Sequence, residues 1–339
     1  MFGDDGHQGF FVEGPFGAFG TQSVHYVCKQ LFHGQALYHR GMARRFSGYN
    51  GETVCRGRCA GRVQDAKEDC VDVAFARKLC ALNSGFYRMQ AKSFSGTRHA
   101  AWPGWRRCMD EVTAAGCLSG PDGVIVDVAC GNLRFEQFAA QTLPHCRLVC
   151  HAVDDCDELA LDQGILHDGA PEVRFCHLDV VGALLDGALD LRGCCGFTQG
   201  ASEGHGADLA VAFGFAHHIP GAGNRTRFLD ALMDTVRPGG FAAVSLWCFM
   251  RDEGLAQRAR ATHTQACGEL GFDPAAFEAE DYLLGWNNAP GAWRYCHSFD
   301  DAEIEGLAAS VATRARLAAR FAADGRTGDL NEYLVFQVR

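Results

Sequence analysis

Short apolar runs alternate with stretches of helical spacing over the second part of the chain. The runs are rich in β-branched residues and short enough for buried strands, whereas the stretches between them repeat apolar residues every three or four positions. Strands that alternate with helices form a parallel sheet with right-handed crossovers, so the pattern predicts an α/β fold. The predicted strands are 124–126, 148–153, 173–178, 208–215 and 241–249, and the predicted helices are 104–119, 135–143, 158–167 and 226–236.

The last part of the chain shows a different arrangement. A polar helix is predicted at 252–270, and a helix with an acidic, capping-box-like start begins at residue 300. Two strands, 314–317 and 332–338, then complete the sheet as an antiparallel pair. The segment 250–299 precedes them and is predicted to be an insertion or a lid.

Residues 1–80 show no sustained helical or alternating periodicity. They are rich in Gly, Arg, His and Phe, a composition that favours a tail or linker over a domain with its own core. Helical spacing first appears at 72–89 and leads into the segments above. We therefore predict a poorly ordered N-terminal extension, 1–80, followed by one domain, 81–339.

The acidic composition restricts the partners of the chain. The formal net charge is −10 and the pI is about 5.7, which argues against indiscriminate binding to nucleic acid, and no DNA partner is expected. The segment 86–107 is locally basic, which indicates either contact with phosphate or carboxylate groups or a solvated surface. No apolar stretch approaches the ~18 residues of a membrane span and the acidic N-terminus is unlike a secretory signal, so we expect a cytoplasmic protein with no membrane partner.

The chain contains 17 cysteines. Reduced thiols are expected, because disulfide frameworks are typical of small secreted domains and not of long enzyme-like chains. A zinc site with four thiolate ligands would need Cys55, Cys59, Cys70 and Cys80, but no pair of them has C-x-x-C spacing. Cys194 and Cys195 are also interpreted as plain thiols. No metal is predicted.

The candidate ligand site is the junction at 122–135, where a β-branched strand leads through a Gly-containing turn into a helix. At such a junction the free N–H groups of the helix meet a ligand, and Gly allows close approach to the backbone. Asp127 closes the strand, Gly131 lies in the turn, and Asp154 ends the second strand, from which it can reach a ribose hydroxyl. The pattern favours a nucleoside and leaves three interpretations open: a nicotinamide dinucleotide, S-adenosylmethionine (SAM), or a structural turn.

Several segments of the chain resemble motifs of the class I SAM-dependent methyltransferases, and they follow one another in the same order as in that family. Residues 127–132 resemble their first motif, 207–219 their fourth strand and the loop after it, and 236–241 the turn into their fifth strand. The resemblance covers residues 86–339 and implies a Rossmann-like doubly wound seven-stranded sheet, mostly parallel with an antiparallel last strand, and SAM as the cofactor. The cofactor-binding residues that it implies are Asp127, Ala129, Cys130, Gly131, Asn132, Asp154, Asp179 as acceptor of the adenine amino group, Phe213 and Gly214.

The first motif departs from the family pattern at two positions, because Ala129 and Leu133 stand where Gly is usual. Ala129 is expected to need only an ordinary φ. Leu133 adds a branched side chain where the backbone and the cofactor normally approach each other. If Leu133 blocked the cofactor, the domain would be a non-catalytic relative that serves as a binding protein, which is one alternative function.

Two segments resemble a narrower group, the methyltransferases that esterify the carboxylate of a modified wobble uridine in tRNA. They are 94–103, which contains Arg98, and 284–299, which contains Arg294-Tyr-Cys-His297. The resemblance implies that Arg98, Arg294 and His297 orient the acceptor carboxylate, a role that suits the planar guanidinium group.

The chemistry of the acceptor stays open in the sequence. A carboxylate is ionised at neutral pH and needs no general base, whereas a hydroxyl or amine acceptor would need one, and His217, His218 and His297 are the candidates. A small metabolite fits the acidic composition as well as tRNA does. Some eukaryotic relatives in this group need a small partner protein, and the sequence does not indicate whether this chain does.

Overall fold

The computed structural model describes residues 71–97, 100–160, 169–197, 206–287 and 289–339. They belong to one compact unit, Asp65–Arg339. The predicted disorder before residue 71 and the thiols at positions 55, 59 and 70 lie outside the described residues, as does Arg98.

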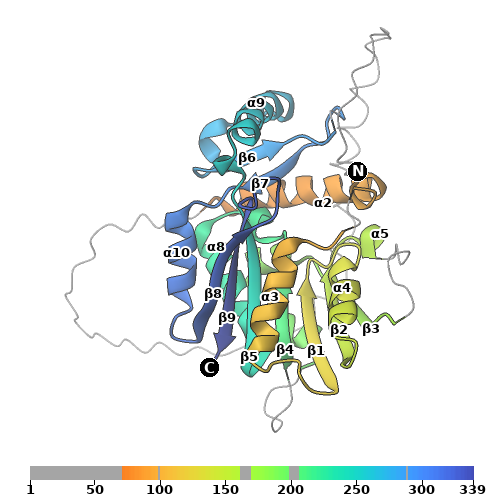
Figure 1. Ribbon diagram of the computed structural model, residues 1–339. Coiled ribbons are helices and arrows are strands. Elements are labelled where there is room, and N and C mark those ends of the chain that lie inside the picture. The colour runs from red at the N-terminus through yellow and green to blue at the C-terminus, as the bar shows by residue number, and fades with distance from the viewer. Residues whose placement is uncertain (1–70, 98–99, 161–168, 198–205, 288) are drawn as a thin grey trace, which may run out of the picture. The chain divides into compact units, whose positions relative to one another are not determined.

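A seven-stranded sheet with the order β3-β2-β1-β4-β5-β9-β8 organises the unit (Figure 1). The neighbouring strands from β3 to β5 pair in parallel, and β9 runs antiparallel to both β5 and β8. The predicted fold class, an α/β doubly wound sheet that is mostly parallel with an antiparallel last strand, is therefore confirmed. The strands are β1 (Asp122–Val128), β2 (Arg147–Asp154), β3 (Glu172–His177), β4 (Ala207–Ala212), β5 (Val236–Trp247), β8 (Ala315–Ala323) and β9 (Asn331–Val338).

Helices pack on both faces of the sheet because its central strands are apolar on both sides. In β1, Val126 and Val128 belong to a core shared with α6, α8 and α10, whereas Ile125 belongs to a core shared with α3 and α4. Successive residues of a strand point to opposite faces, so one β-branched run supplies both cores. The helices are α2 (Val73–Ser95), α3 (Pro103–Ala114), α4 (Arg134–Thr142), α5 (Asp157–Ala160), α6 (Val180–Leu185), α7 (Leu191–Cys194), α8 (Ala222–Asp234), α9 (Glu253–Leu270) and α10 (Asp301–Ser310), with the 3-10 helices η2 (Ala216–His218), η3 (Phe249–Arg251) and η4 (Pro274–Ala276). No described helix is long and apolar enough to cross a membrane.

Helix α2 corrects the predicted domain boundary at residue 80, because it runs through that position without interruption. Asp72 caps its first turn by accepting a hydrogen bond from a backbone N–H group. Phe75 and Leu79 are buried in one cluster with Leu283 and Tyr295 of the segment predicted as a lid. The folded domain therefore includes α2 from its first residue.

The segment 250–299 contains α9 and a separate antiparallel pair, β6 (Asp281–Leu284) and β7 (Arg294–His297). Helix α2 contacts β7 as well as α5 and α6, which follow the carboxyl ends of β2 and β3. Figure 1 shows α2 crossing above the sheet, with β6, β7 and α9 beyond it. These elements therefore cover the edge of the sheet at which open α/β sheets bind ligands.

Cys194 contradicts the prediction of a plain thiol, because it forms a disulfide with Cys176. The bridge joins α7 to β3. Cys195 is a free, buried thiol, as expected. The crossover through α6 brings the two bonded residues together, and their separation of 18 positions in the sequence gives no sign of it.

Candidate active site

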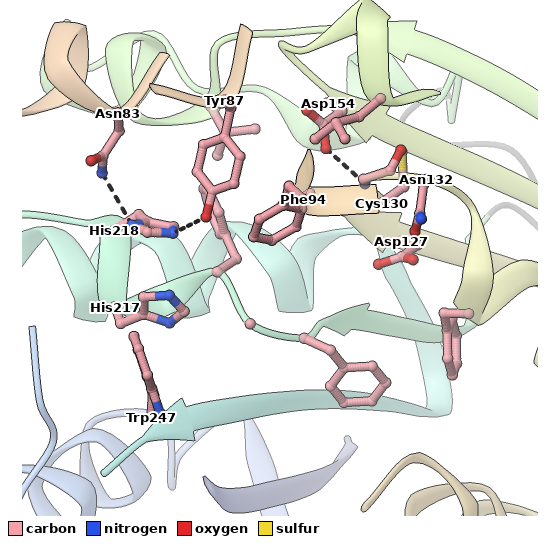
Figure 2. Close-up of a pocket in the computed structure, with 18 of the residues that line it drawn as sticks. Asn83, Tyr87, Phe94, Asp127, Cys130, Asn132, Asp154, His217, His218 and Trp247 are labelled. Atoms are coloured by element: carbon pink, nitrogen blue, oxygen red, sulfur yellow. Dashed lines mark hydrogen bonds between the residues drawn. The ribbon is translucent and has the colours of Figure 1, made fainter. Parts of the chain in front are cut away.

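A cavity of about 400 Å³ lies at the carboxyl ends of β1, β2 and β4. In the sheet, β2 lies on one side of β1 and β4 lies on the other, so the strand order reverses at β1. This switch point of the sheet is the expected place for a ligand. Figure 2 shows two groups of side chains around it. We call Asp127, Asp154 and the turn between β1 and α4 the acidic end. We call the following group the aromatic end: Tyr87, His217, His218, Trp247 and Arg294.

The turn after β1 has a left-handed backbone at three alternate positions. The φ angles are 62° at Ala129, 55° at Gly131 and 62° at Leu133. The expectation of an ordinary φ at Ala129 was wrong. The N–H groups of Ala129 and Cys130 both donate to the carbonyl of Val153, at 2.7 and 3.2 Å, and hold the chain in this conformation. A left-handed residue that is not Gly costs about 1–2 kcal/mol, so the turn is strained at two positions.

Leu133 does not fill the cavity. Its side chain is 3% exposed and packs in a small cluster with Cys130, Ala152 and Val173. It is not among the cavity residues, whereas Ala129, Cys130 and Gly131 are. The left-handed φ of Leu133 turns its side chain into the protein, and the space beside the turn stays open.

Asp154 joins the end of β2 to this turn. Its Oδ2 accepts a hydrogen bond from the N–H group of Gly131 at 2.8 Å, and its Oδ1 accepts one from Cys156 at 2.9 Å. Asp154 also lines the cavity, and Figure 2 shows its carboxyl group facing the turn. Burial raises the pKa of Asp154 to about 6. The carboxyl oxygens have further lone pairs with which to accept from a ligand.

Asp127 and Glu136 form a buried pair of carboxyl groups behind the turn. Asp127 lines the cavity at the end of β1 and is 3% exposed, and Glu136 in the first turn of α4 has no exposed surface. Burial and the contact with Glu136 raise the pKa of Asp127 well above its usual range. Burial raises the pKa of Glu136 to about 8. At neutral pH the pair therefore retains a proton.

Asn132 connects the turn to α2. Its Nδ2 donates to Ser95 Oγ at 2.9 Å, and its Oδ1 accepts from Arg134 Nε at 3.1 Å. On the other side, the N–H group of Gly214 donates to Ser245 Oγ at 2.8 Å, and Phe213 stacks on Trp105. Both Phe213 and Gly214 line the cavity.

Asp179 has a clear local role. It caps α6, and its Oδ1 accepts a hydrogen bond from the N–H group of Gly182 at 2.8 Å. It also lines the cavity. The geometry is that of a helix cap, which was the alternative interpretation, and contact with adenine stays a prediction.

The two histidines after β4 both line the cavity, on η2. His218 is held from both sides, because its Nε2 lies 2.8 Å from the hydroxyl of Tyr87 and its Nδ1 lies 3.1 Å from Asn83 Nδ2 (Figure 2). Burial, together with the charge of Arg294, lowers the pKa of His218 to about 3. His218 is therefore neutral in the physiological range. The ring of His217 packs edge-on against Trp247, with centroids 5.1 Å apart.

A metal ion at the aromatic end is disfavoured by these bonds. His217, His218 and Cys296 offer ligand atoms within 4.8 Å of one another. Both ring nitrogens of His218, however, are already engaged, and the Nδ1 atom also lies 2.9 Å from the carbonyl of Tyr295. Burial raises the pKa of Cys296 to about 12, which keeps the thiol protonated.

Arg294 is a buried cation with no ion pair in the described part of the chain. Its side chain lies over the rings of Phe86, Trp247 and Trp286, 5.3 to 5.7 Å from their centroids. It is 7% exposed, and its Nε has no hydrogen-bond acceptor among the described residues. Its guanidinium group interacts with Tyr87. Aromatic faces stabilise a cation only partly, so the charge is available to an anion in the cavity.

His297 is not brought to this cavity, although the sequence placed it with Arg294. Its Nδ1 lies 2.8 Å from Asp281 Oδ1 and its Nε2 lies 2.6 Å from Glu303 Oε2. Burial alone would lower the pKa of His297, but these two carboxylates outweigh it and raise the pKa. Residues 294 and 297 are three apart on β7, and an odd spacing in a strand directs side chains to opposite faces.

The sequence analysis missed several residues of the site, among them Tyr87, Glu136 and Trp247. Glu136 could have been noticed, since it lies among apolar residues that face the core, Phe135 and Phe138. Asn83 and Tyr87 are four residues apart, a spacing that puts two polar groups on one face of α2. Trp247 gave no local signal, because it is one more apolar residue in a mostly apolar run at the end of β5.

No protein-family model matches the chain. A tRNA (carboxymethyluridine(34)-5-O)-methyltransferase of Arabidopsis thaliana is 27% identical over 168 residues, which are 49% of this chain and 33% of that protein. The chain thus spans about a third of that relative's length.

Solved structures of low similarity include a SAM-dependent methyltransferase of Methanosarcina mazei, with a TM-score of 0.45 and 14% identity over 67% of this chain and 96% of the other. The 1,6-didemethyltoxoflavin-N1-methyltransferase of Burkholderia thailandensis, solved with S-adenosylhomocysteine, gives a TM-score of 0.44 and 14% identity over 81% of this chain and 93% of the other. The sequence relative of Arabidopsis thaliana is also named a methyltransferase, in agreement with the resemblance that the sequence motifs indicated.

Proposed function

We propose that this chain is a SAM-dependent methyltransferase that transfers a methyl group to a carboxylate. Arg294 carries the proposal. It places a buried positive charge at one end of the cavity, with no ion pair to any described residue, while the acidic residues expected to bind the cofactor lie at the other end. An acceptor with a negative charge complements the first end, and a cofactor with positive charge complements the second.

The acidic end fits SAM by the chemistry of its groups. Asp154 would accept hydrogen bonds from the ribose hydroxyls, and Asp127 would face the positively charged part of the cofactor. The turn that contains Ala129, Cys130 and Gly131 leaves the backbone open to the cavity. SAM, when bound, supplies a methyl group on a sulfonium sulfur. These carboxylates therefore match a cationic nucleoside better than a dinucleotide, because they would repel the two phosphates of a dinucleotide.

The aromatic end would hold the acceptor. A guanidinium group binds a carboxylate through two parallel N–H···O bonds, which fixes the plane of the acceptor. Burial between aromatic rings strengthens that interaction, because little water is present to screen it. Arg98, outside the described residues, remains a proposed second contact. His297 is not proposed, because both of its ring nitrogens are engaged elsewhere.

A carboxylate acceptor needs no general base, which agrees with the state of His218. The pKa of such an acceptor lies near 4, so it is ionised at neutral pH, and the protein needs only to align it with the methyl group and exclude water. His218 has a pKa of about 3 and both ring nitrogens bonded, which makes it a poor proton acceptor. A chain built for a hydroxyl acceptor would need a histidine with a pKa closer to 7 at this position.

The proposal is tested by incubating the protein with SAM labelled on its methyl group, together with either total RNA or a small-molecule extract. The expected result is label in the tRNA fraction that mild alkali releases as methanol, because methyl esters hydrolyse in base and N-methyl groups do not. Label that is stable to alkali would contradict the carboxylate acceptor, and failure to bind SAM in calorimetry would contradict the cofactor.

A small carboxylic acid is the second candidate acceptor, and the net charge of −10 favours it over a polyanion. Salt dependence separates the two. Binding to tRNA releases counterions and should weaken steeply as salt rises, whereas a small acid that meets Arg294 should depend on salt only weakly. Steady-state KM for each acceptor between low and physiological salt is the measurement.

A further inference from the structure

Glu136 is an unusual residue for its place in the fold. It lies on the inner side of α4, has no exposed surface, and neither carboxyl oxygen has a well-formed hydrogen bond to a donor among the described residues. Its polar neighbours include its own backbone N–H group and the carboxyl group of Asp127. A buried carboxyl group normally gains a donor or a cation, so its position calls for a physical reason.

Among the described residues, no cation is bonded to the pair. Asp154 approaches from β2 and carries charge of the same sign. Arg134 of α4 directs its guanidinium group to Asn132 Oδ1 and to the carbonyl of Ala100, at 3.1 and 2.9 Å. Its charge lowers the pKa of Asp127, but burial and the neighbouring carboxyl groups outweigh it. The thiols of Cys130 and of Cys150 have pKa values raised by burial and stay neutral.

Two carboxyl groups in contact cannot both be ionised in a buried site unless a positive charge arrives. Without a ligand they share one proton. Asp127 borders the cavity and Glu136 lies behind it, so a cation that reaches Asp127 changes the charge that the pair can carry. The geometry thus links occupation of the cavity to the protonation of a residue that no ligand touches.

We propose that Glu136 is a positioning residue that shares one proton with Asp127, and that the pair releases this proton when the positively charged end of SAM binds beside Asp127. The inference rests on the proposed function, namely on SAM binding in this cavity. Affinity for SAM should then rise with pH up to the point at which the free pair ionises by itself, and level off above it. Below that point the dissociation constant should fall up to about tenfold per pH unit, the limit for one released proton.

Calorimetry of SAM binding at pH 7 in phosphate and in Tris tests the inference, because the difference in observed heat between two buffers counts the protons exchanged. With the pKa of Glu136 at about 8, the wild type should release roughly one proton per SAM bound. Glu136→Gln should bind SAM and release close to none, since its amide can donate to an ionised Asp127. The matched control is Glu111→Gln on α3, an exposed acid, which should behave as wild type.

The outcomes are distinct. Binding of SAM by the wild type with no proton exchanged, or equal proton release by Glu136→Gln, would overturn the inference and leave the proposed function intact. No binding of SAM by the wild type would overturn both. If Glu136→Gln does not fold, 5′-methylthioadenosine replaces the variant: it keeps the nucleoside but lacks a positive charge, so it should bind to the wild type without releasing a proton, and release equal to that with SAM would overturn the inference.

Discussion

The acidic end and the aromatic end of the cavity bury charge of opposite sign, and neither end forms an ion pair with another described residue. At the acidic end Asp127 and Glu136 contact each other, and no cation from the described part of the chain is bonded to them. At the aromatic end Arg294 lies between rings. Elsewhere in the same domain, a buried cation is paired conventionally, since Arg225 bonds both Glu278 and Glu303.

The contrast with Arg225 distinguishes charges that serve the fold from charges that await a ligand. Burying an unpaired charge destabilises a protein, and such costs persist where a site needs them. Arg225 joins α8 to α10 and to the loop before β6, so its pairs hold elements together. Asp127, Glu136 and Arg294 form no such ion pairs among the described residues. Their charges are therefore best explained by ligands, a cation at one end and an anion at the other.

The largest expected effect comes from removing the charge of the aromatic end. Arg294→Met should lower kcat/KM for the acceptor by about 100-fold or more, because losing one partner of a buried charge pair costs about 2–5 kcal/mol. The affinity for SAM should be unchanged, and the melting temperature should be equal or higher, because an unpaired buried cation is removed. Arg316→Met, at an exposed position of β8, is the control. A variant that loses SAM binding and acceptor activity together would show that the two ends are not separate.

The acidic end should make the stability of the unliganded protein depend on pH. Burial raises the pKa of Glu136 to about 8, while in the unfolded chain it is about 4.3. The contribution of Glu136 to the free energy of unfolding is therefore fully present below pH ~4. It is lost as pH rises toward ~8, where the folded pair must ionise. Each unit of pKa difference corresponds to about 1.4 kcal/mol, so the effect should reach a few kcal/mol.

The test of that dependence is urea unfolding of the wild type and Glu136→Leu at pH 5 and pH 8. The free energy of unfolding of the wild type should fall more between the two pH values than that of the variant. Saturating SAM should remove most of the difference, because it balances the ionised pair. Parallel pH profiles for the two proteins would contradict this account of the acidic end.

Asp154 should have a smaller effect, confined to the cofactor. Asp154→Ala removes the acceptor expected to bind the ribose and also frees the N–H group of Gly131. Hydrogen bonds to charged groups contribute about 1.5–3 kcal/mol, so the dissociation constant for SAM should rise roughly 10- to 100-fold. Asp122→Ala, which breaks an exposed ion pair at the start of the same sheet, should leave it unchanged. An unaltered affinity in Asp154→Ala would remove Asp154 from the cofactor site.

The course of the chain could be predicted where one local pattern decides it. The alternation of apolar runs and helical stretches determines the parallel part of the sheet, and Asp154 ends its strand as predicted. Strand β8 extends well beyond the predicted 314–317, because pairing with β9 stabilises a run in which Ala and Arg give only a weak strand signal.

The contents of the cavity could be predicted only in part, because they depend on which elements meet there. The partners of His297 come from β6 and α10, and the partners of His218 come from α2 and β7. Neither set is visible from the spacing of residues around the histidine. The same holds for Glu136. Its carboxyl group is part of the site only because α4 places it beside Asp127 near the end of β1.

The smallest predicted effect concerns the backbone that connects the two ends, with their charges left intact. Ala129→Gly should raise the free energy of unfolding by about 0.5–1 kcal/mol, because relief of a left-handed φ of 62° outweighs the greater freedom of Gly in the unfolded chain. Ala302→Gly, at an exposed position in α10, has an ordinary helical φ and should lower stability by about the same amount. If the turn were unstrained, Ala129→Gly would instead destabilise the protein as much as Ala302→Gly. That result would mean that the hydrogen bonds to the carbonyl of Val153 hold Ala129 in this conformation without strain. The turn would then store no energy for the site.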